Sequence, residues 1–425
     1  MRGFGMSAPF WIERPSGFAR VNARAAFSLI GVRMKSFAAS AVVDRTRDGY
    51  HVEILGVEEL DAHADAWAAL AERALEPNVF FAPGFALPLA RHALAKARPN
   101  FVAIWRDGAD AKLVGLFPLA HRSFGSGRLA RLWLDKQATL TAPLLDPECA
   151  PAALRAFFLH LRRMGGVSAV VFPRLVDGGP LHVALTSFAQ ETGRKVETLA
   201  AFERAALRPG SDVDALVRRG ASHHALKELH RRRRRMEQLG AVEFSLLSEP
   251  REVRPAVEQF LALEASGWKG ARGALLKHPE LAAFARCATR LMARAGKCQV
   301  ARLTLDGRPL AMGIVFESQD RAFFWKIAYD ESRRALAPGI DLVHRLSVVL
   351  AARGDIALTD SCAIANHPMI DRFWPDRLAI RDLAVEVDPT RPRGFRRACA
   401  GEALRLKLRG EVKRLANGLL RRKTS

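Results

Sequence analysis

The chain carries the same order of secondary-structure signals twice, and this repeat limits the folds that it can adopt. Each copy begins with a short apolar run, continues with two helical stretches, and reaches two apolar runs joined by Asp-Gly. These segments are 52–55, 58–75, 85–95 and 101–120 in the first copy, and 242–246, 251–265, 279–295 and 299–316 in the second. Asp-Gly between alternating apolar runs is a strong signal for a β-hairpin. A further helix and strand follow in both copies, so the sequence predicts two mixed α/β domains.

The charge is unevenly distributed along the chain. The net charge is +22, but residues 1–40 contain six Lys or Arg and one Glu, and residues 390–425 contain twelve Lys or Arg and two Glu. Most of the excess therefore lies at the two ends, which favours basic tails near an anionic surface over a basic fold. We expect residues 1–48 to be an unstructured basic segment. Residues 389–425 are expected to form a basic tail. This tail is either solvated, or it forms an amphipathic helix that lies on an anionic membrane or a partner.

Three parts lie between these ends. Residues 49–207 contain the first copy, 208–240 form a basic helical linker, and 241–388 contain the second copy. In the linker, Ser211 and Ser222 are placed to cap two successive helices.

Five adjacent arginines, Arg231–Arg235, lie in the second linker helix. Successive residues of an α-helix turn by about 100°, so the five side chains cannot all face one ligand. The run is either a solvated face, or one or two of its arginines reach an acidic or phosphorylated acceptor. For the second case, Arg231 is our candidate substrate-binding residue.

Composition and motifs exclude several classes of protein. No run of about 18 uncharged apolar residues is present, so we expect no membrane-spanning helix. The five cysteines are scattered and form no Cys-x-x-Cys pair, which argues against a disulfide framework or zinc site and for a reducing cytoplasm. The motifs of serine hydrolases, zinc proteases and P-loop proteins are missing, and we expect no metal.

The block 323–342 has the pattern of an anion-binding loop. An apolar run ending at Tyr329 is followed by a loop and by a helix that begins at Pro338-Gly339. Backbone N–H groups and the positive end of the helix dipole meet at such a helix start, and both attract anions. We expect the pyrophosphate of an acyl-CoA there, and the first copy lacks this pattern. The candidate cofactor-binding residues are Arg333, Arg334, Ala337, Gly339, Ile340 and Asp341. The alternative is an ordinary helix cap with solvated arginines.

Lys326 and Tyr329 are candidate catalytic residues in the same run. Strand alternation places Lys326 with Ala328 on one face of the strand and Tyr329 with Trp325 on the other. A lysine inside an apolar strand normally has a partner or faces a cleft, where it can contact substrate or a developing oxyanion. The Tyr329 hydroxyl can protonate a departing thiolate. Its alternative role is packing.

Two further candidates follow in the next strand and loop. Asp360 ends the apolar strand 356–360, and His367 lies in the loop behind it. A carboxylate or an imidazole that faces a cleft from a strand end can act as a general base. The alternatives are turn formation for Asp360 and helix capping for His367.

Several blocks occur in an order typical of one bacterial family. They are Arg231–Gly240, Leu263–Gly270, Trp325–Leu342 and Thr359–Trp374. On these blocks, residues 50–388 resemble the CelD-like proteins, which are GNAT-superfamily members associated with cellulose and exopolysaccharide synthesis. More distantly, the tandem layout and the basic helix resemble the Fem peptidyltransferases, which take aminoacyl groups from charged tRNA.

The resemblance implies an α/β fold made of a tandem pair of GNAT-like acyltransferase domains that face each other, the first of them degenerate. It implies an acyl-CoA donor bound by the second domain and an amine or hydroxyl acceptor. Glu264 would lie in the acceptor wall as a candidate base, with Trp268 and Lys269 as substrate-binding residues. Ala337 stands where the superfamily's loop has its first Gly, and Pro338 removes one amide donor.

These inferences together predict a cytoplasmic acyltransferase, similar to N-acetyltransferases and peripheral to the inner membrane. It would use acetyl-CoA or another acyl-CoA and serve cellulose, exopolysaccharide or envelope assembly, with a small-molecule, saccharide or peptide-like acceptor. Two alternatives stay open. One is a Fem-like transferase that uses charged tRNA, the only case in which nucleic acid is an expected partner. The other is a non-catalytic scaffold for a membrane polysaccharide synthase.

Overall fold

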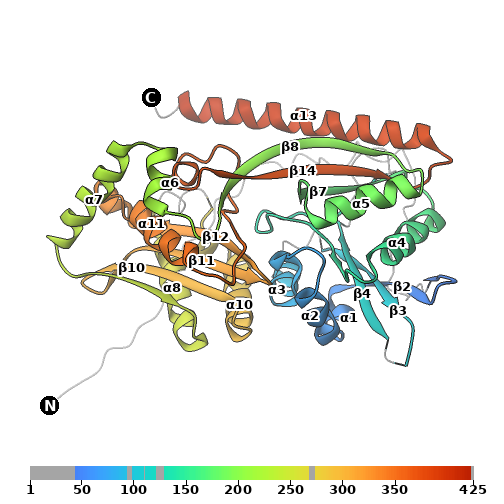
Figure 1. The fold of residues 1–425 in the computed structure, drawn as a ribbon, viewed down its shortest axis with the longest axis horizontal. Helices are drawn as coiled ribbons and strands as arrows, with labels where there is room; N and C mark the ends of the chain where they lie inside the picture. Colours follow the sequence, from blue (N-terminus) through green and yellow to red (C-terminus); the bar gives the residue numbers. More distant parts are fainter. Residues whose placement is uncertain (1–43, 93–97, 110, 121–128, 268–272, 423–425) are drawn as a thin grey trace, which may run out of the picture. The chain divides into compact units, whose positions relative to one another are not determined.

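The structure is a computed structural model that describes residues 44–422, with gaps at 93–97, 110, 121–128 and 268–272 (Figure 1). Most of the segment expected to be unstructured, 1–43, lies outside the described residues. Its last part differs from the expectation. Residues 44–45 form a strand that pairs with His51 and Val52, because the backbone of a short hairpin satisfies its own hydrogen bonds there.

The first half of the chain builds a five-stranded antiparallel sheet of order β1-β2-β3-β4-β6 and three strands of a second sheet. Its elements are β1 (Asp44–Arg45), β2 (Tyr50–Leu55), α1 (Val57–Asp61), α2 (Ala64–Glu72), η1 (Val79–Phe81), α3 (Pro83–His92), β3 (Asn100–Arg106), β4 (Lys112–Leu119), β5 (Leu129–Arg131), β6 (Leu144–Leu145), α4 (Ala150–Met164), β7 (Ala169–Val176), α5 (Pro180–Glu191) and β8 (Val196–Leu207).

The second half builds the rest of a nine-stranded mixed sheet of order β5-β7-β14-β8-β13-β12-β11-β10-β9. Its elements are α6 (Val213–Gly220), α7 (His223–Glu237), β9 (Val242–Leu247), α8 (Pro250–Ser266), η2 (Leu275–Lys277), α10 (Pro279–Arg294), β10 (Cys298–Leu305), β11 (Arg308–Ser318), β12 (Arg321–Tyr329), η3 (Glu331–Leu336), α11 (Pro338–Ala351), β13 (Leu358–Asp360), α12 (Ile370–Phe373), β14 (Asp376–Glu386) and α13 (Pro392–Arg422).

The two predicted hairpins are confirmed. Strand β3 pairs with β4, and β10 pairs with β11, both antiparallel. In the second hairpin Leu305 lies opposite Arg308, so Asp306 and Gly307 form a two-residue turn. Both turn residues have positive φ, 49° and 74°, which is the conformation that Asp-Gly supplies at low cost. The mixed α/β class predicted from the repeat is likewise confirmed.

The last strand of each half pairs with the other half. Strand β8 closes the first half in sequence, yet it runs antiparallel beside β13 of the second half. Strand β14 closes the second half, and it pairs with β7 and β8. The sequence predicts two separate domains, with the first ending at Leu207, but this exchange joins the halves through one continuous sheet (Figure 1).

A buried ion pair lies where the exchanged strand meets the second half. Arg204 on β8 donates to the Asp360 carboxylate on β13, and both side chains are almost fully buried. Arg204 also donates to the backbone carbonyl of Thr139, 3.1 Å away. Because a buried charge is costly without a partner, each of the two groups depends on the other.

Aromatic packing also joins the halves. Phe85 on α3 contacts the rings of Phe284, Phe316 and Trp325, with centroids 5.2 to 5.8 Å apart. Phe80 contacts Phe323 in the same manner. These side chains belong to one hydrophobic cluster that draws on both halves, so neither half has this core to itself.

The segment 208–240 is not a free linker. Helix α6 and helix α7 bury Val213, Val217 and Leu229 in the core of the second half. Asp212, and not Ser211, caps α6, because the helix begins at Val213 and the residue directly before it accepts from the amide of Ala215. Ser222 caps α7 as expected.

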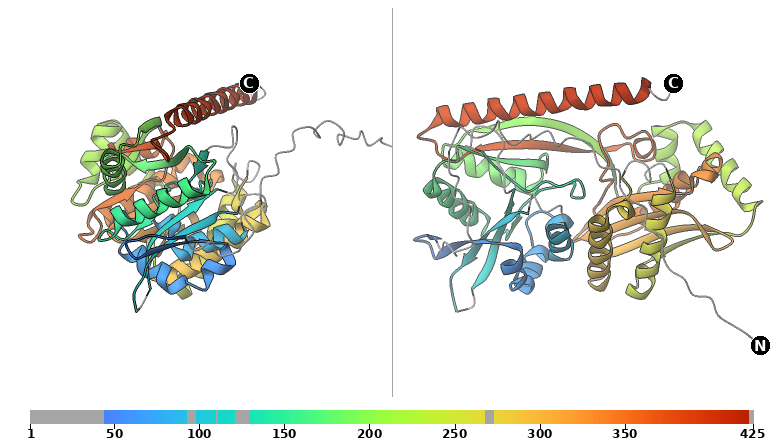
Figure 2. Two further views of the ribbon diagram at one scale, coloured as in Figure 1. Left: turned by 90° about the vertical axis from the view of Figure 1, so that its right-hand side faces the viewer. Right: turned by 180° about the vertical axis from the view of Figure 1, so that it is seen from behind.

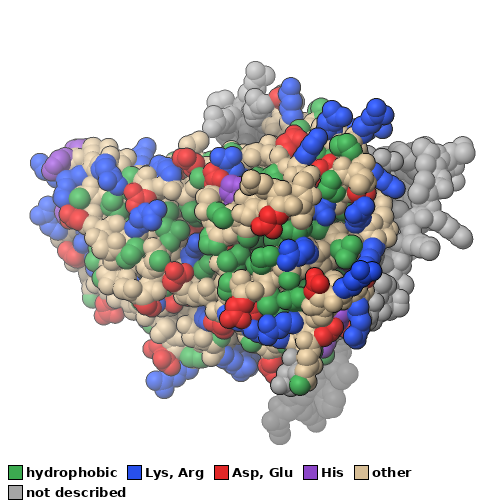
Figure 3. Space-filling model, turned by 45° about the vertical axis from the view of Figure 1, so that its right-hand side comes forward, with side chains coloured by type: hydrophobic (Ala, Val, Ile, Leu, Met, Phe, Trp, Pro, Cys, Tyr) green, Lys and Arg blue, Asp and Glu red, His purple; other side chains and the backbone are tan. Residues whose placement is uncertain are grey.

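The C-terminal segment is a helix and not a solvated tail over its first part. Phe395, Ala398 and Cys399 of α13 are buried against the sheet, and Glu402 pairs with Arg131 of β5. Figures 1 and 2 show α13 running along β8 and β14. Basic side chains are also spread over the face seen in Figure 3, with acidic ones between them.

Replacing Arg204 by Leu should destabilise the protein strongly, because it leaves the Asp360 carboxylate buried without a partner. We expect a loss of about 3 to 5 kcal/mol in the free energy of unfolding, measured by urea denaturation. Removing both charges with Arg204→Leu and Asp360→Leu should recover most of this loss.

The control for this measurement is Arg286→Leu. Arg286 pairs with Glu258 at the surface, with 43% and 51% of the side chains exposed, so its loss should cost less than about 1 kcal/mol. Equal losses in the two arginine variants would contradict the structural role of the buried pair.

Candidate active site

Strands β12 and β13 run parallel and then separate. They pair only between Arg321–Phe323 and Leu358–Asp360. Beyond Phe323, β12 continues to Tyr329 hydrogen-bonded to β11, while the chain after β13 turns at Cys362, which has a φ of 54°. Among the described residues, no strand therefore pairs with the β13 side of β12 over the part that contains Lys326 and Tyr329.

A bulge in β12 changes which side chains share a face. The register with β11 shifts by one residue at Trp325, between Phe324 and Lys326. As a result Trp325 and Ala328 pack in the core shared by both halves, whereas Phe324 and Tyr329 pack in the core under α11. The alternation predicted from the sequence was wrong for Trp325, because a bulge shifts the period of two by one residue.

Lys326 lies beside the first half of the chain. Its ammonium group is 4.8 Å from the centroid of the Trp325 ring, a cation–π arrangement. The Trp325 indole N–H donates to the carbonyl of Gln137, 2.9 Å away. Lys326 also interacts electrostatically with Cys362, on the chain that leaves β13. The first half thus contacts Trp325, the ring against which the Lys326 ammonium group packs.

The predicted anion loop has the expected strand, loop and helix order. Helix α11 begins at Pro338 after Ala337, which has left-handed backbone angles of 52° and 49° at a cost of about 1 kcal/mol or more for a residue with a Cβ. Arg333 and Arg334 are exposed in η3. A Cβ on Gly339 would lie 3.2 Å from Cδ1 of Tyr329, so a larger residue here would press on the Tyr329 ring.

A pocket of about 340 Å³ brings together three of the five predicted catalytic residues. Glu264 of α8, Tyr329 of β12 and His367 line it. The remaining lining residues are Leu263, Gly267, Ile327, Ala328, Glu331, Pro368 and Met369. Its walls are therefore mostly apolar, with two carboxylates, one phenol and one imidazole.

Two of these polar groups are held by backbone amides. Glu264 is 4% exposed, and one of its oxygens accepts from the amide of Leu275, 2.9 Å away. His367 Nδ1 lies 3.4 Å from the amides of Met369 and Ile370, just before α12, although the N-cap residue of this helix is Met369 and not His367. Both side chains are oriented before any ligand arrives.

Asp360 is kept apart from this pocket. One carboxylate oxygen accepts from Arg204, and the other accepts from the amide of Cys362, 2.8 Å away. The group is fully buried. The structure thus gives Asp360 two structural contacts and does not bring it to the pocket wall.

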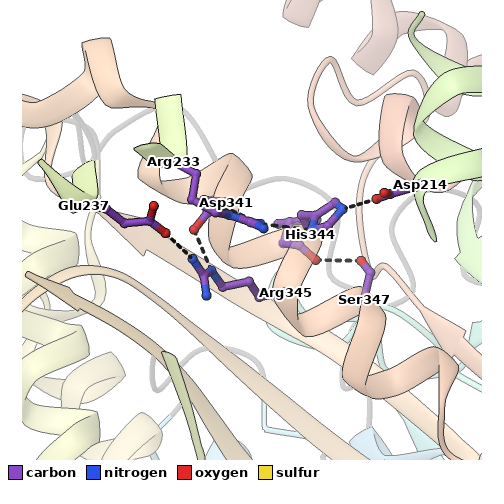
Figure 4. A network of polar contacts seen from close by, with 8 residues as sticks. Asp214, Arg233, Glu237, Asp341, His344, Arg345 and Ser347 are labelled. Carbon is purple, nitrogen blue, oxygen red and sulfur yellow. Dashed lines mark hydrogen bonds and ion pairs between the residues drawn. The ribbon is translucent and has the colours of Figure 1, made fainter. Parts of the chain in front are cut away.

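Asp341 lies in the first turn of α11, and its side chain is held by two arginines. Its carboxylate is fully buried and accepts from Arg233 of α7, 2.7 Å away, and from Arg345 of α11, 2.8 Å away (Figure 4). Arg345 is also 4.0 Å from Glu237. The cofactor residue predicted from the sequence is therefore the centre of a charged network between two helices.

His344 extends this network. Its Nδ1 lies 3.2 Å from Arg233, and its Nε2 lies 2.7 Å from the Asp214 carboxylate (Figure 4). Because a guanidinium can only donate hydrogen bonds, Nδ1 of His344 accepts one from Arg233. Nε2 then carries the hydrogen and donates a hydrogen bond to the Asp214 carboxylate. Burial lowers the pKa of His344 below its ordinary value, against the opposing effect of Asp214, so the ring is neutral near pH 7.

The five arginines divide between the two expected roles. Arg231 and Arg232 pair with Glu228, and these bonds lower the pKa of that carboxyl to about 2. Arg233 is the one that reaches inward. Arg234 and Arg235 are exposed. Arg231, predicted to bind substrate, is thus at the surface, and the predicted Trp268 and Lys269 lie outside the described residues.

Sequence reasoning missed Arg233 and His344 as members of the site's support. A signal was present in the sequence, since Asp341, His344 and Ser347 recur at a spacing of three in a helix that is otherwise apolar except for Arg345. Ser347 accepts from the indole N–H of Trp374 and completes this polar stripe.

Comparison with known proteins assigns the second half. Residues 223–366, from α7 to the loop after β13, match the model of the acetyltransferase (GNAT) domain. The matched segment is about a third of the chain. The protein is an acyltransferase, and GNAT domains generally take acyl-CoA as the donor.

One solved structure, FemX, shares the fold at low identity. FemX is 9% identical, with a TM-score of 0.51, and the match covers 76% of this chain and 95% of FemX. A tandem GNAT protein from the clavulanic acid biosynthesis pathway is 17% identical, with a TM-score of 0.38, over 80% of this chain and 99% of that one. No curated protein sequence matches the chain. None of the helices in the described residues could span a bilayer, because each is too short or too polar.

The neutral state of His344 predicts a pH dependence of stability. Its folded pKa lies below the unfolded value of 6.5, so the unfolded chain binds a proton first as the pH falls, and stability is lost below that value. We expect His344→Gln to flatten the decrease of the melting temperature between about pH 7.5 and about pH 5.5.

The control is His224→Gln, because His224 is exposed on α7. It should leave the pH profile unchanged. A profile of His344→Gln that coincides with the wild type would show that this imidazole is not buried in its neutral form.

Proposed function

We propose that the chain transfers an acetyl or other acyl group from acyl-CoA to an amine or hydroxyl acceptor, with the donor at the start of α11. The observation that carries the proposal is the position of Tyr329. Its ring contacts Gly339 at the helix start, and it lines the pocket that holds Glu264 and His367. One side chain thus lies beside both the expected donor phosphates and the expected acceptor.

On the donor side, the backbone of Ala337, Gly339 and Ile340 would bind the pyrophosphate, with charge from Arg333 and Arg334. Tyr329 would protonate the departing thiolate, and Lys326 would stabilise the developing oxyanion. These roles need no metal.

On the acceptor side, Glu264 and His367 are the candidate bases, and their carboxylate and imidazole suit an amine or a hydroxyl group. Trp268, Lys269 and Arg231 remain proposed substrate-binding residues. A small molecule, a saccharide or a peptide-like group fits a pocket of about 340 Å³ with mostly apolar walls. The CelD-like blocks support a role in cellulose, exopolysaccharide or envelope assembly at the cytoplasmic face of the inner membrane.

A second candidate is a transferase that uses charged tRNA. A groove of about 580 Å³ between α8 and α10 supports it. Its basic lining consists of Arg254, Arg286, Arg290 and Arg294, with Glu258 as a carboxylate among them. Such a surface suits a polyanion. Binding that weakens steeply with salt, in the absence of acyl-CoA binding, would favour this candidate.

A peripheral membrane contact is proposed for α13. Leu404 and Leu408, one turn apart, are 57% and 56% exposed, and Arg397 and Lys407 flank them on the helix. Apolar residues bordered by basic ones are the pattern of helices that lie on anionic bilayers.

The donor site is tested by isothermal titration calorimetry with acetyl-CoA. The wild type should bind, and Gly339→Glu should not, because the new side chain presses on Tyr329 and places a negative charge where phosphate would sit. Gly354→Glu is the matched control, since a Cβ there meets open space. Equal affinity in Gly339→Glu and the wild type would overturn the assignment of the loop.

The membrane contact is tested by co-sedimentation with phosphatidylglycerol-containing vesicles. Leu404→Glu with Leu408→Glu should remove most of the binding. The control changes two exposed leucines elsewhere, Leu276→Glu and Leu291→Glu, and should keep it. If the controls release the protein as fully as the α13 variant, the helix has no special part in the contact.

A further inference from the structure

The predicted anion site contains a charge of the wrong sign. Asp341 lies in the first turn of α11, three residues after Pro338, which is about 5 Å along the helix axis. Its carboxylate is fully buried. A carboxylate at this position repels an incoming phosphate, and burial in a medium of low dielectric strengthens that repulsion.

Two guanidinium groups enclose this carboxylate. Arg345 comes from the next turn of the same helix, and Arg233 comes from α7, so only Arg233 ties Asp341 to another element among these contacts. Arg233 is itself mostly covered, with 22% of its side chain exposed. Its Nη2 lies 3.2 Å from Nδ1 of His344. Arg233 therefore has a fixed position and cannot swing freely to a ligand.

We infer that Arg233 is a positioning residue for the donor site, which cancels the charge of Asp341 and so makes the start of α11 attractive to a phosphate. The inference rests on the proposed function, because it concerns the same helix start. It also gives one arginine of the run a task that its neighbours do not share. Arg231 and Arg232 are bound to Glu228, and Arg234 and Arg235 point to solvent.

A structural role alone would give a different pattern in variants. If Arg233 and Asp341 only hold α7 against α11, removing either one should weaken stability and donor binding together. If Arg233 cancels the charge of Asp341, the two variants should differ in binding. Arg233→Gln leaves the Asp341 carboxylate with Arg345 as its one remaining guanidinium partner among these contacts and so makes the helix start more negative, whereas Asp341→Asn removes the carboxylate charge.

The experiment measures acetyl-CoA affinity by calorimetry and the melting temperature by circular dichroism on the same full-length variants. We expect Arg233→Gln to weaken affinity about tenfold, since one of the two positive charges that offset the buried carboxylate is lost near the ligand. Asp341→Asn should melt lower than the wild type and still bind acetyl-CoA at least as tightly. The double variant Arg233→Gln with Asp341→Asn should regain most of the affinity lost in Arg233→Gln.

Two further variants keep the outcome interpretable. Arg234→Gln is the control within the run and should bind as the wild type does. Arg233→Lys retains the positive charge, so it should keep most of the affinity. If Arg233→Gln does not fold, Asp341→Asn tests the inference, because weakened binding in that variant would overturn it.

The results separate the two proposals. No binding of acetyl-CoA by the wild type would overturn the donor-site assignment and, with it, this role of Arg233. Binding by the wild type with unchanged affinity in Arg233→Gln, or a double variant as weak as Arg233→Gln, would overturn the inference while leaving the donor site in place. Weakened binding in Asp341→Asn would likewise overturn it and indicate that Asp341 orients Arg233 toward the ligand.

Discussion

The exchange of terminal strands is the constraint on which the rest of the structure depends. Because β8 lies between β13 and β14, the nine-stranded sheet is built from both halves of the chain. The buried pair of Arg204 and Asp360 fixes the register at that boundary, since neither charge is tolerated in the interior without the other. The site then follows from this sheet. Strand β12 separates from β13 just beyond the pair, and the first half contacts Trp325 beside Lys326.

Local signals in the sequence predicted most of the elements. The hairpin at Asp306-Gly307, the cap at Ser222 and the helix that begins at Pro338 depend on a few neighbouring residues, so a single sequence is sufficient to find them. The exchange of β8 and β14 depends on partners more than 150 residues apart in the chain, and no local pattern encodes that choice. The bulge at Trp325 was missed because the run around it is apolar on both faces, which hides a shift in the period.

The candidate site was predictable to a similar extent. Glu264, Tyr329 and His367 do line one pocket, which the repeat and the family blocks together suggested. The position of Asp360 was not predictable, because Arg204, its partner, lies in the other copy of the repeat. Asp341 was predicted to bind the cofactor through its backbone amide. In the structure its carboxylate instead joins α7 and α11 through Arg233 and Arg345. Its two guanidinium partners come from segments that a linear reading treats as unrelated.

The late position of β14 in the sequence bears on how the protein is made. During synthesis the first half emerges early, yet β7 has one of its neighbours, β14, only after residue 386 has left the ribosome. Until then β7 presents buried residues such as Val170 and Phe172 along an open edge. The first half therefore cannot complete its own fold during translation, and a truncated chain that lacks the last 50 or so residues would expose an edge prone to aggregation.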